Sequence, residues 1–455
     1  MATNKYNRRS FLKGSASVAA LMSLPVPGFS QTTLSTRVEW QVFKTTPQYA
    51  SFLNAVKLMK AETDSTKPTS WTYWANVHLN YCPHMQPYFF AWHRGYLYYF
   101  EQQLRIVSGD SALTLPYWDY YTYPNMPSEF TDAASGNPLY VSGRVNTNVY
   151  AALTLAPFSS SIVNMQRGTS NSYEASFESA PHNPVHNIIG GWMADMSSPI
   201  DPIFYLHHAN VDRLWDAWCL EPPTIVPAPN SSYWSGSFTY ATNLTIARSR
   251  CYRPESLNYQ YAKPNNVPTR LPQSAQVGRI IRVQAQLAPI LTRPPIGNFP
   301  NMAARSVSNN RRSLGGVANV RLNEASVSAR LTLQEASTTT FKYPHLVLDK
   351  LAVTALGRNG GYYYNIYLNL PASGDADVAR ASHFIGTFGA FEASGAIHHN
   401  GSTLMLPLAD VLQNLGVTNL SEAVISLVRV NGPNSPKGDV LSVGEMRVER
   451  STDGP

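Results

Sequence analysis

Cysteine is scarce in this chain, and the three that occur are far apart: Cys82, Cys219 and Cys251. Such spacing neither forms a disulfide framework nor supplies the CxxC pairs of a structural zinc site, so both scaffolds are excluded. Because the number is odd, we expect at least one of these thiols to have a role other than pairing.

Charged residues are also few, at 14% of 455 residues, whereas hydrophobic residues make up 44%. This composition excludes an intrinsically disordered chain. The formal net charge is +7, but residues 1–30 contribute four basic and no acidic side chains, which leaves +3 for the rest. The first 262 residues contain no basic stripe interleaved with aromatics, so we expect no nucleic-acid partner.

No segment after residue 30 is long and apolar enough to span a bilayer, so no membrane partner is expected. The apolar stretch at residues 16–24 is itself too short, and Pro25 ends it. It follows the twin arginines Arg8 and Arg9, a pattern typical of export signals. Residues 1–30 are therefore predicted to be a twin-arginine-type signal peptide that directs the protein to the periplasm or the exterior. This route carries folded proteins, which suits an enzyme that acquires a metal before crossing the membrane.

The length of the chain favours two domains, because one hydrophobic core rarely serves 455 residues. Apolar residues recur with the 3.6-residue period of helices at residues 42–60, 88–107 and 209–220. We expect a mainly α catalytic domain over residues 31–262. Residues 263–325 carry scattered prolines and are predicted to be a linker.

From residue 326 the pattern becomes that of β-strands. Residues 362–370 alternate between two faces with a period of two, as half-buried strands do. Residues 424–430 and 440–448 are further predicted strands, and residues 408–415 a short helix. We expect a β-sandwich domain over residues 326–455.

Histidine is the residue type with the most uneven distribution, since seven of eleven lie between residues 78 and 208. His182 and His186 are four apart, so on a helix both imidazoles face the same way and can share a metal ion. His93 and His208 lie in apolar helical runs, where an uncompensated imidazole is costly to bury. A single such histidine is more often a hydrogen-bonded core residue, but that explanation fails for the whole set.

A donor set made only of imidazole nitrogens suits copper, zinc or iron. Three neutral nitrogens leave an open coordination position, which indicates a catalytic or gas-binding centre rather than a structural one. The residue types alone do not distinguish between copper, zinc and iron as the bound metal.

The segments around the histidines resemble the CuA and CuB blocks of type-3 copper proteins: tyrosinases, catechol oxidases and molluscan-type haemocyanins. The likeness covers roughly residues 36–262 and is carried by His93-Arg94-x-Tyr-Leu, His182-Asn-x-x-His186 and Asp201-Pro-Ile-Phe-x-x-His207-His208. It implies a four-helix bundle that holds two copper ions and uses O2 as co-substrate. The implied CuA ligands are His78, His84 and His93, and the implied CuB ligands are His182, His186 and His208. His207 then becomes a packed neighbour, although spacing alone does not separate it from His208.

Further roles follow from the same resemblance. Cys82, two residues before His84, matches a cysteine that forms a thioether with the ligand imidazole in some members; the alternative is a small buried thiol. Cys219 and Cys251 would then be left to pair in an oxidising compartment. Met196 is a candidate gate residue at the entrance near CuB.

Glu178 and Asn183 resemble a glutamate and an asparagine that together hold an activating water, the base that a monophenol needs. The alternative is an ordinary helix-start carboxylate beside a capping amide. Asn187, which follows His186, is neutral and offers no cationic clamp for a substrate carboxylate.

The ends of the resemblance mark the domain limits. Tyr259-Gln-Tyr261 resembles the tyrosine motif that ends the catalytic core, and Arg37 resembles the arginine that packs near it. Residues 341–450 resemble the C-terminal domain of plant polyphenol oxidases, which covers the active-site entrance and keeps the proenzyme latent.

Taken together, the resemblance implies a copper-dependent oxidase that hydroxylates small monophenols and oxidises o-diphenols to o-quinones, latent until its C-terminal domain is displaced. Three alternatives stay open: a catechol or o-aminophenol oxidase without monophenolase activity, a haemocyanin-like O2 carrier, and a zinc hydrolase. A copper-loading partner is a further expectation, and the sequence does not indicate an oligomeric state.

Overall fold

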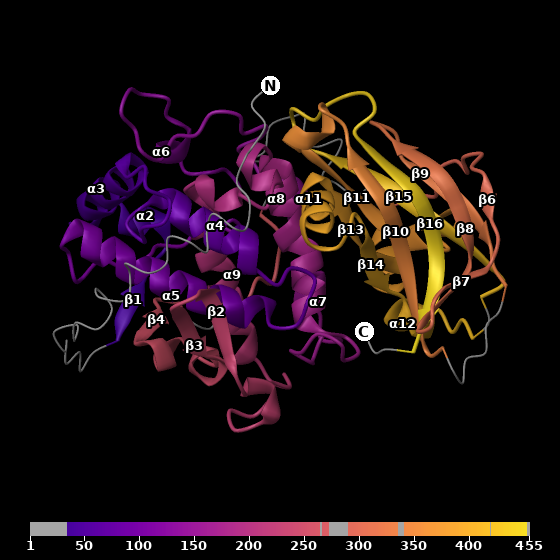
Figure 1. The fold of residues 1–455 in the computed structure, drawn as a ribbon, viewed down its shortest axis with the longest axis horizontal. Coiled ribbons are helices and arrows are strands. Elements are labelled where there is room, and N and C mark those ends of the chain that lie inside the picture. The colour runs from indigo at the N-terminus through magenta and orange to yellow at the C-terminus, as the bar shows by residue number, and fades with distance from the viewer. Residues whose placement is uncertain (1–33, 264–265, 273–289, 335–340, 419, 453–455) are drawn as a thin grey trace.

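The computed structural model describes residues 34–263, 266–272, 290–334, 341–418 and 420–452, which form two bodies lying side by side (Figure 1). The helical body comprises the described residues up to 263, and the β body comprises those from 290 onwards. The predicted signal peptide at residues 1–30 lies outside the described residues.

Four helices of the helical body carry most of the clustered histidines. They are α4 (Trp71–Tyr81), α5 (Phe89–Ser108), α8 (Asn183–Ile189) and α9 (Ile203–Cys219). Helix α5 packs against both α9 and α3 (Gln48–Ala61). The expectation of a mainly α first domain is confirmed.

The ends of these helices follow from local residue chemistry. Helix α5 ends at Gly109, whose φ of 71° is the left-handed conformation that glycine adopts without a steric penalty. Helix α9 begins directly after Pro202, earlier than the predicted start at 209. The predicted helix at 42–60 is two helices, α2 (Trp40–Phe43) and α3, with Pro47 at the N-cap of α3.

The two ends of the helical body are fastened to each other. Strand β1 (Ser35–Arg37) pairs in parallel with β4 (Tyr259–Tyr261). The fully buried Arg37 guanidinium donates to Glu101 at 2.8 Å and to the Tyr261 hydroxyl at 3.2 Å, and lies 3.5 Å from Asp212. The predicted proximity of Arg37 to the tyrosine motif is confirmed.

The β body is a sandwich of two antiparallel sheets. One sheet has the order β14-β10-β16-β8-β6, with β7 also paired to β8, and the other has the order β13-β11-β15-β9. The first sheet consists of β14 (Leu404–Pro407), β10 (Tyr343–Val353), β16 (Leu441–Ser451), β8 (Arg311–Leu322), β6 (Asn301–Met302) and β7 (Arg305–Ser308). The second consists of β13 (Phe384–Gly389), β11 (Tyr362–Leu368), β15 (Glu422–Asn431) and β9 (Val327–Thr332).

Apolar residues from both sheets fill the space between them, among them Leu346 and Met446 from one sheet and Ile366 and Leu427 from the other. The three predicted strands correspond to β11, β15 and β16, and the predicted short helix to α12 (Ala409–Asn414). The β-sandwich expectation is therefore confirmed.

The predicted linker at residues 263–325 extends too far along the chain. Strand β8 runs through its last third and lies inside the six-stranded sheet, paired with β16. Residues 311–322 contain no proline, and their buried side chains Leu314, Val317, Val320 and Leu322 belong to the sandwich core. The prolines that suggested a linker all precede β8, so the β body begins earlier than residue 326.

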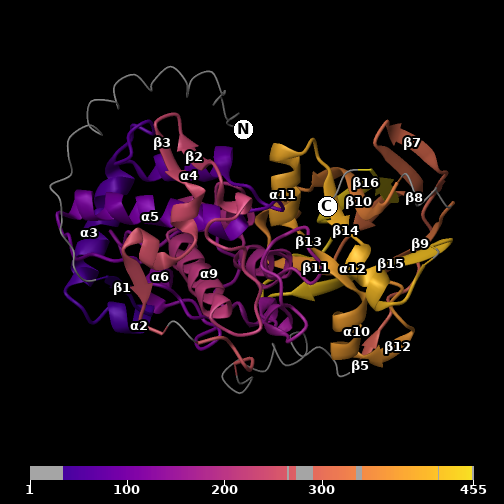
Figure 2. The ribbon, with the colours of Figure 1, turned by 90° about the horizontal axis from the view of Figure 1, so that it is seen from below.

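Helix α11 (Ala390–His399) lies where the two bodies meet, against α8 of the helical body and β10 of the β body (Figures 1 and 2). Backbone groups come close at this junction, since the Gly361 amide donates to the Asn187 carbonyl at 2.7 Å. A Cβ atom at Gly389 would lie 2.3 Å from the Asn187 side-chain oxygen, so only glycine fits there.

We predict that Arg37→Met lowers the free energy of unfolding by about 3 to 5 kcal/mol, because it removes one of the two cations that neutralise each of the buried carboxylates of Glu101 and Asp212. Denaturant unfolding of the full chain, followed by tryptophan fluorescence, measures this change. Lys67→Met is the control, since its ion pair with Glu62 at 3.2 Å is open to solvent and screened by it. Equal unfolding midpoints for the two variants would contradict the prediction.

Candidate metal centre

The first histidine group comes from α4, α5 and the loop between them. His78 lies in α4, His93 in α5 and His84 in the connecting loop. The donor atoms of these imidazoles and of the Cys82 thiol all lie within 4.8 Å of one another. His78 and His93 are buried, so their imidazoles meet away from solvent.

The second histidine group consists of His182 at the end of the turn η4 (Glu178–His182), His186 in α8, and His207 and His208 in α9. The Nε2 atom of His208 lies 3.4 Å from that of His182 and 3.3 Å from that of His186. Imidazole nitrogens about 2.0–2.1 Å from one tetrahedral ion are themselves roughly 3.3 Å apart. These three side chains therefore have the geometry of ligands to one ion.

The two groups are neighbours. The His93 and His208 rings stack with their centroids 4.3 Å apart and their planes 16° apart. The His84 and His182 rings also stack, at 5.8 Å. Two ions, one in each group, would thus lie close enough to act on the same small molecule.

Backbone carbonyls orient three of these rings. The Nδ1 atoms of His78, His93 and His186 lie 2.7–2.8 Å from the carbonyl oxygens of Met196, Phe89 and Met193. Each bond fixes Nδ1 as the protonated nitrogen and leaves Nε2 as the donor to a metal. Within the described part of the chain, Nε2 of His78 is buried with no hydrogen-bond partner, as expected of a metal ligand.

Burial also keeps the imidazoles neutral. It lowers the pKa of His78 to about 4 and that of His182 to about 3. Burial, followed by the nearby imidazoles, holds the pKa well below its ordinary value for the other four: His84, His93, His186 and His208. At neutral pH each of these six imidazoles is neutral and has one unprotonated nitrogen that can bind a metal without losing a proton.

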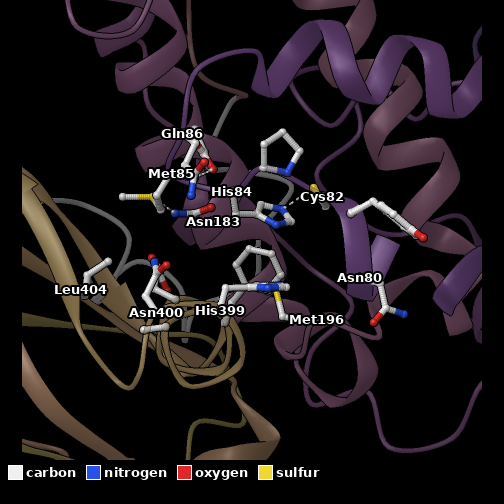
Figure 3. Close-up of a pocket in the computed structure, with 17 residues that line it drawn as sticks. Asn80, Cys82, His84, Met85, Gln86, Asn183, Met196, His399, Asn400 and Leu404 are labelled. Atoms are coloured by element: carbon white, nitrogen blue, oxygen red, sulfur yellow. Dashed lines mark hydrogen bonds between the residues drawn. The ribbon is translucent and has the colours of Figure 1, made fainter. Parts of the chain in front are cut away.

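A cavity of about 290 Å³ opens beside the two groups, and its walls come from both bodies (Figure 3). Phe391 of α11 reaches from the β body to the histidines through this cavity. Its ring stacks on His186, with centroids 4.1 Å apart and planes 17° apart, and lies 5.2 Å from the His84 ring.

Comparison with known proteins agrees with this geometry. The family model for the common central domain of tyrosinase matches residues 51–152 and 141–221. The tyrosinase of Streptomyces lincolnensis is 30% identical over 191 residues, which cover 32% of this chain and 68% of that protein. This chain belongs to the tyrosinase family.

Other relatives of this tyrosinase-family chain are more distant or less fully covered. Tyrosinase HcTyr1 of Hahella sp. is 30% identical over 245 residues, and the chloroplastic polyphenol oxidase of Malus domestica is 27% identical over 274. The chain spans about half of the length of these two relatives, 52% and 45%. Latent apple tyrosinase has the same fold, with a TM-score of 0.52 and 20% identity over 94% of this chain and 98% of that one.

The tyrosinase-family core follows an export signal. Residues 5–25 match the twin-arginine translocation signal, which confirms the predicted export across a membrane. Among the described residues, no helix combines the length and apolar character that crossing a bilayer requires. Since the family is that of the type-3 copper proteins, the two histidine groups point to a dicopper centre.

The predicted pairing of Cys219 with Cys251 is wrong, because neither cysteine forms a disulfide. The Cys251 sulfur lies against α5, 3.2 Å from where a Cβ atom of Gly95 would stand. The Cys82 sulfur lies 3.7 Å from Nε2 of His84 and 3.4 Å from Nε2 of His93. Cys82 is therefore next to the imidazole with which the family likeness associates it.

Glu178 and Asn183 both line the cavity, but they do not bond to each other directly. The Glu178 carboxylate forms an ion pair with Arg167 and accepts from the Met85 amide at 2.7 Å. Burial raises the pKa of Glu178 to about 7, although Arg167 opposes this shift. The Asn183 side-chain oxygen lies 2.8 Å from Nδ1 of His182, so it orients that ring.

Four residues that line the cavity or bind a residue lining it were not identified from the sequence: Met85, Arg167, Phe391 and Glu392. Three of them act across long gaps in the chain, and Arg167 pairs with Glu178, 11 positions further on. The side-chain nitrogen of Asn187, for example, donates to the Glu392 carboxylate at 2.7 Å, and its side-chain oxygen accepts from the backbone amide of Phe391 at 2.9 Å. No periodicity or local motif in a single sequence marks such contacts.

Proposed function

We propose that the protein is a copper-dependent phenol oxidase that uses O2 to oxidise o-diphenols to o-quinones and to hydroxylate monophenols. We further propose that it is latent while Phe391 occupies the cavity. The observation that carries the proposal is the convergence of two sets of three neutral imidazoles, which lie next to each other beside a cavity that His84 lines.

In this proposal His78, His84 and His93 hold one copper, and His182, His186 and His208 hold the other. The Nε2 separations of 3.3 and 3.4 Å within the second set support it. His207 is also within reach, but its nitrogens make no such close approach to the Nε2 atoms of His182 and His186. We therefore assign His207 to packing, where its ring stacks on His182 at 5.3 Å.

Bound copper would supply the electrons for the reduction of O2, and the protein supplies neutral ligands, fixed geometry and a dry surface. Phe89 and Phe204 pack against the imidazoles, with centroids 4.7 Å from His93 and 4.2 Å from His208. These rings exclude water from the histidines on the side facing the core. The cavity is the side from which a small phenol would approach.

The position of Phe391 supports both the substrate class and the latency. Its aromatic ring already stacks on His186, so a planar phenol ring fits the same place. While Phe391 remains there, the substrate has no access to that surface. Asn187 holds it in place through hydrogen bonds to Phe391 and Glu392. Displacement of α11 is the step that we propose for activation.

Two smaller assignments belong to the same proposal. Cys82 would form a thioether with His84, which its sulfur approaches to 3.7 Å. Met196 would line the entrance, since it borders the cavity next to α11. We also propose residues 31 to about 263 as the catalytic domain, with the β body as its cap.

Hydroxylation of a monophenol needs a base, for which we propose Glu178 with Asn183 beside it. The ion pair with Arg167 favours a second candidate, a catechol or o-aminophenol oxidase without monophenolase activity. A carboxylate already neutralised by a guanidinium is a weaker base than a free one. The pH dependence of the two activities separates these candidates.

We predict that His208→Gln lowers the copper content from two ions per chain to one and abolishes catechol oxidation, because three-nitrogen coordination is lost at one site. Metal analysis and O2 consumption with catechol measure the two effects. The control is His345→Gln, a buried histidine of β10 whose Nδ1 lies 3.1 Å from the Tyr343 carbonyl, which should keep both coppers. Full activity in His208→Gln would overturn the proposal. O2 binding without quinone formation in a Phe391→Ala variant, in which the side chain that blocks the cavity is removed, would favour the carrier.

We predict that Phe391→Ala raises kcat/KM for a catechol by about tenfold or more, because it increases the fraction of molecules whose site is open. The matched control is Ile397→Ala on the same helix, whose side chain is 44% exposed and should not affect access. Initial quinone formation measures both. Equal rates of quinone formation by Phe391→Ala and Ile397→Ala would contradict the proposal that Phe391 blocks access to the site.

We predict that monophenol hydroxylation falls roughly tenfold per pH unit below pH 7, because Glu178 with a pKa of about 7 becomes protonated there and can accept no proton. Catechol oxidation should depend less on pH in this range. Arg167→Met, which removes the opposing charge, should move the monophenol profile to higher pH. These rates are measured with Phe391→Ala in the background, and a constant ratio of the two activities from pH 5 to 8 would exclude Glu178 as the base.

A further inference from the structure

The wall of the cavity carries no lysine or arginine among the described residues that line it (Figure 3). The helical body contributes mainly neutral side chains to this wall, such as those of Asn80, Tyr81 and Gln86. Its one carboxylate there, that of Glu178, is paired with Arg167. A ligand that carries a carboxylate would therefore meet no free cation among these residues.

Asp195 places a carboxylate next to this wall. It directly precedes Met196, which lines the cavity and whose carbonyl lies 2.8 Å from Nδ1 of the buried His78. Within the described part of the chain, the Asp195 oxygens accept from neutral donors, the Ser197 amide at 2.8 Å and the Ser394 hydroxyl of α11 at 2.9 Å. The groups that hold this carboxylate do not neutralise its charge.

Tyr81 brings an aromatic ring to the same region. It follows His78 by three residues in α4, so the two side chains lie on one face of that helix. Met196 is bound to His78, and both Tyr81 and Met196 line the cavity. A carboxylate and an aromatic ring together attract an ammonium group, by opposite charge and by the cation–π interaction.

Helix α11 shows which kind of ligand extends from the histidines towards Asp195. The Phe391 ring lies on His186 with centroids 4.1 Å apart, and the Ser394 hydroxyl donates to Asp195. Phe391 and Ser394 are three apart in α11, so their Cβ atoms are about 5–6 Å apart on one face of the helix. An aromatic ring in the place of Phe391 that carries a short chain with a terminal donor would direct this donor towards Asp195.

We propose that Asp195 makes the cavity select phenols that carry an ammonium group over phenols that carry a carboxylate, once Phe391 no longer fills it. The inference rests on the proposed function and adds the charge of the substrate to it. Asn187, which follows His186, offers a carboxylate no compensating charge, since its neutral side chain is engaged by α11. A charge several ångströms away in partly hydrated surroundings changes binding by about two- to fivefold.

The test compares three catechols that differ only in the substituent at one ring position: aminoethylcatechol, methylcatechol and carboxyethylcatechol. The full chain with Phe391→Ala oxidises each at about pH 7.5, where the amine and the carboxylate are both charged. Each kcat/KM is divided by that of methylcatechol, so that effects on access and on copper content cancel. We expect Asp195→Asn in this background to lower the relative value for aminoethylcatechol about two- to fivefold, and to raise that for carboxyethylcatechol by a similar factor. The change should lie in KM, because the charge acts on substrate and transition state alike.

Asp195→Asn keeps the size of the side chain and can keep both contacts that hold it, so the variant removes the charge alone. Asp132→Asn is the matched control, because this exposed aspartate also accepts from a backbone amide, that of Ala134 at 3.0 Å, but does not line the cavity. Equal substrate ratios with and without Asp195→Asn would overturn the proposal, as would an equal shift in Asp132→Asn, which indicates an effect of net charge. An ionic strength of about 1 M should weaken the preference, since charges are then screened beyond about 3 Å.

Binding without metal separates this inference from the proposed function. Phenethylammonium and phenylpropanoate carry the same two charges but no phenol hydroxyl, and NMR titration of the metal-free Phe391→Ala chain gives their dissociation constants. We expect phenethylammonium to bind more tightly, and Asp195→Asn to remove the difference. Equal dissociation constants in the Phe391→Ala chain would contradict the selection by charge. Failure of the proposed function looks different, because the difference in binding would then remain while no catechol is oxidised.

Discussion

Six imidazoles are buried in the helical body and that of His84 is partly buried, and their desolvation is the constraint around which the site is built. Burial favours the neutral form of each ring, so none of them is held in place by a charge. Backbone carbonyls instead bind the Nδ1 atoms of three rings and turn each Nε2 inward. This leaves unpartnered donor nitrogens facing each other, an arrangement that costs free energy unless a metal binds there.

Other residues of the helical body hold these imidazole rings in fixed positions relative to one another. Arg94, which directly follows His93 in α5, and Asp212, one turn after His208 in α9, form a fully buried ion pair at 2.7 Å. The other carboxylate oxygen of Asp212 accepts a hydrogen bond from the Tyr259 hydroxyl, and the Arg37 guanidinium lies beside it. These contacts connect the two ends of the helical body to the Arg94–Asp212 ion pair. The stacking of His93 on His208 thus depends on a polar network that lies behind the histidines.

In the proposed function the β body controls access to this centre. Asn187 follows His186, a proposed ligand, and at the same time binds two consecutive residues of α11. Phe391 and the helix that carries His186 are therefore fastened to each other by one side chain. A single displacement of α11 would then free the cavity for a phenol.

The helical and β bodies and the two histidine groups were predictable from the sequence, because helical and strand periods and the spacing of ligand motifs are local properties of the chain. Strand β8 was missed, because the prolines before it suggested a linker that continued further. The contacts made by Arg167, Phe391 and Met85 depend on segments that meet only after folding, and so does the failure of Cys219 and Cys251 to pair. The sequence by itself determined which side chains can bind a metal, since that is a matter of residue chemistry and spacing. Only the tertiary structure decided which groups neutralise, orient and cover them, because such contacts join residues far apart in the chain, as between Asn187 and Glu392, 205 positions apart.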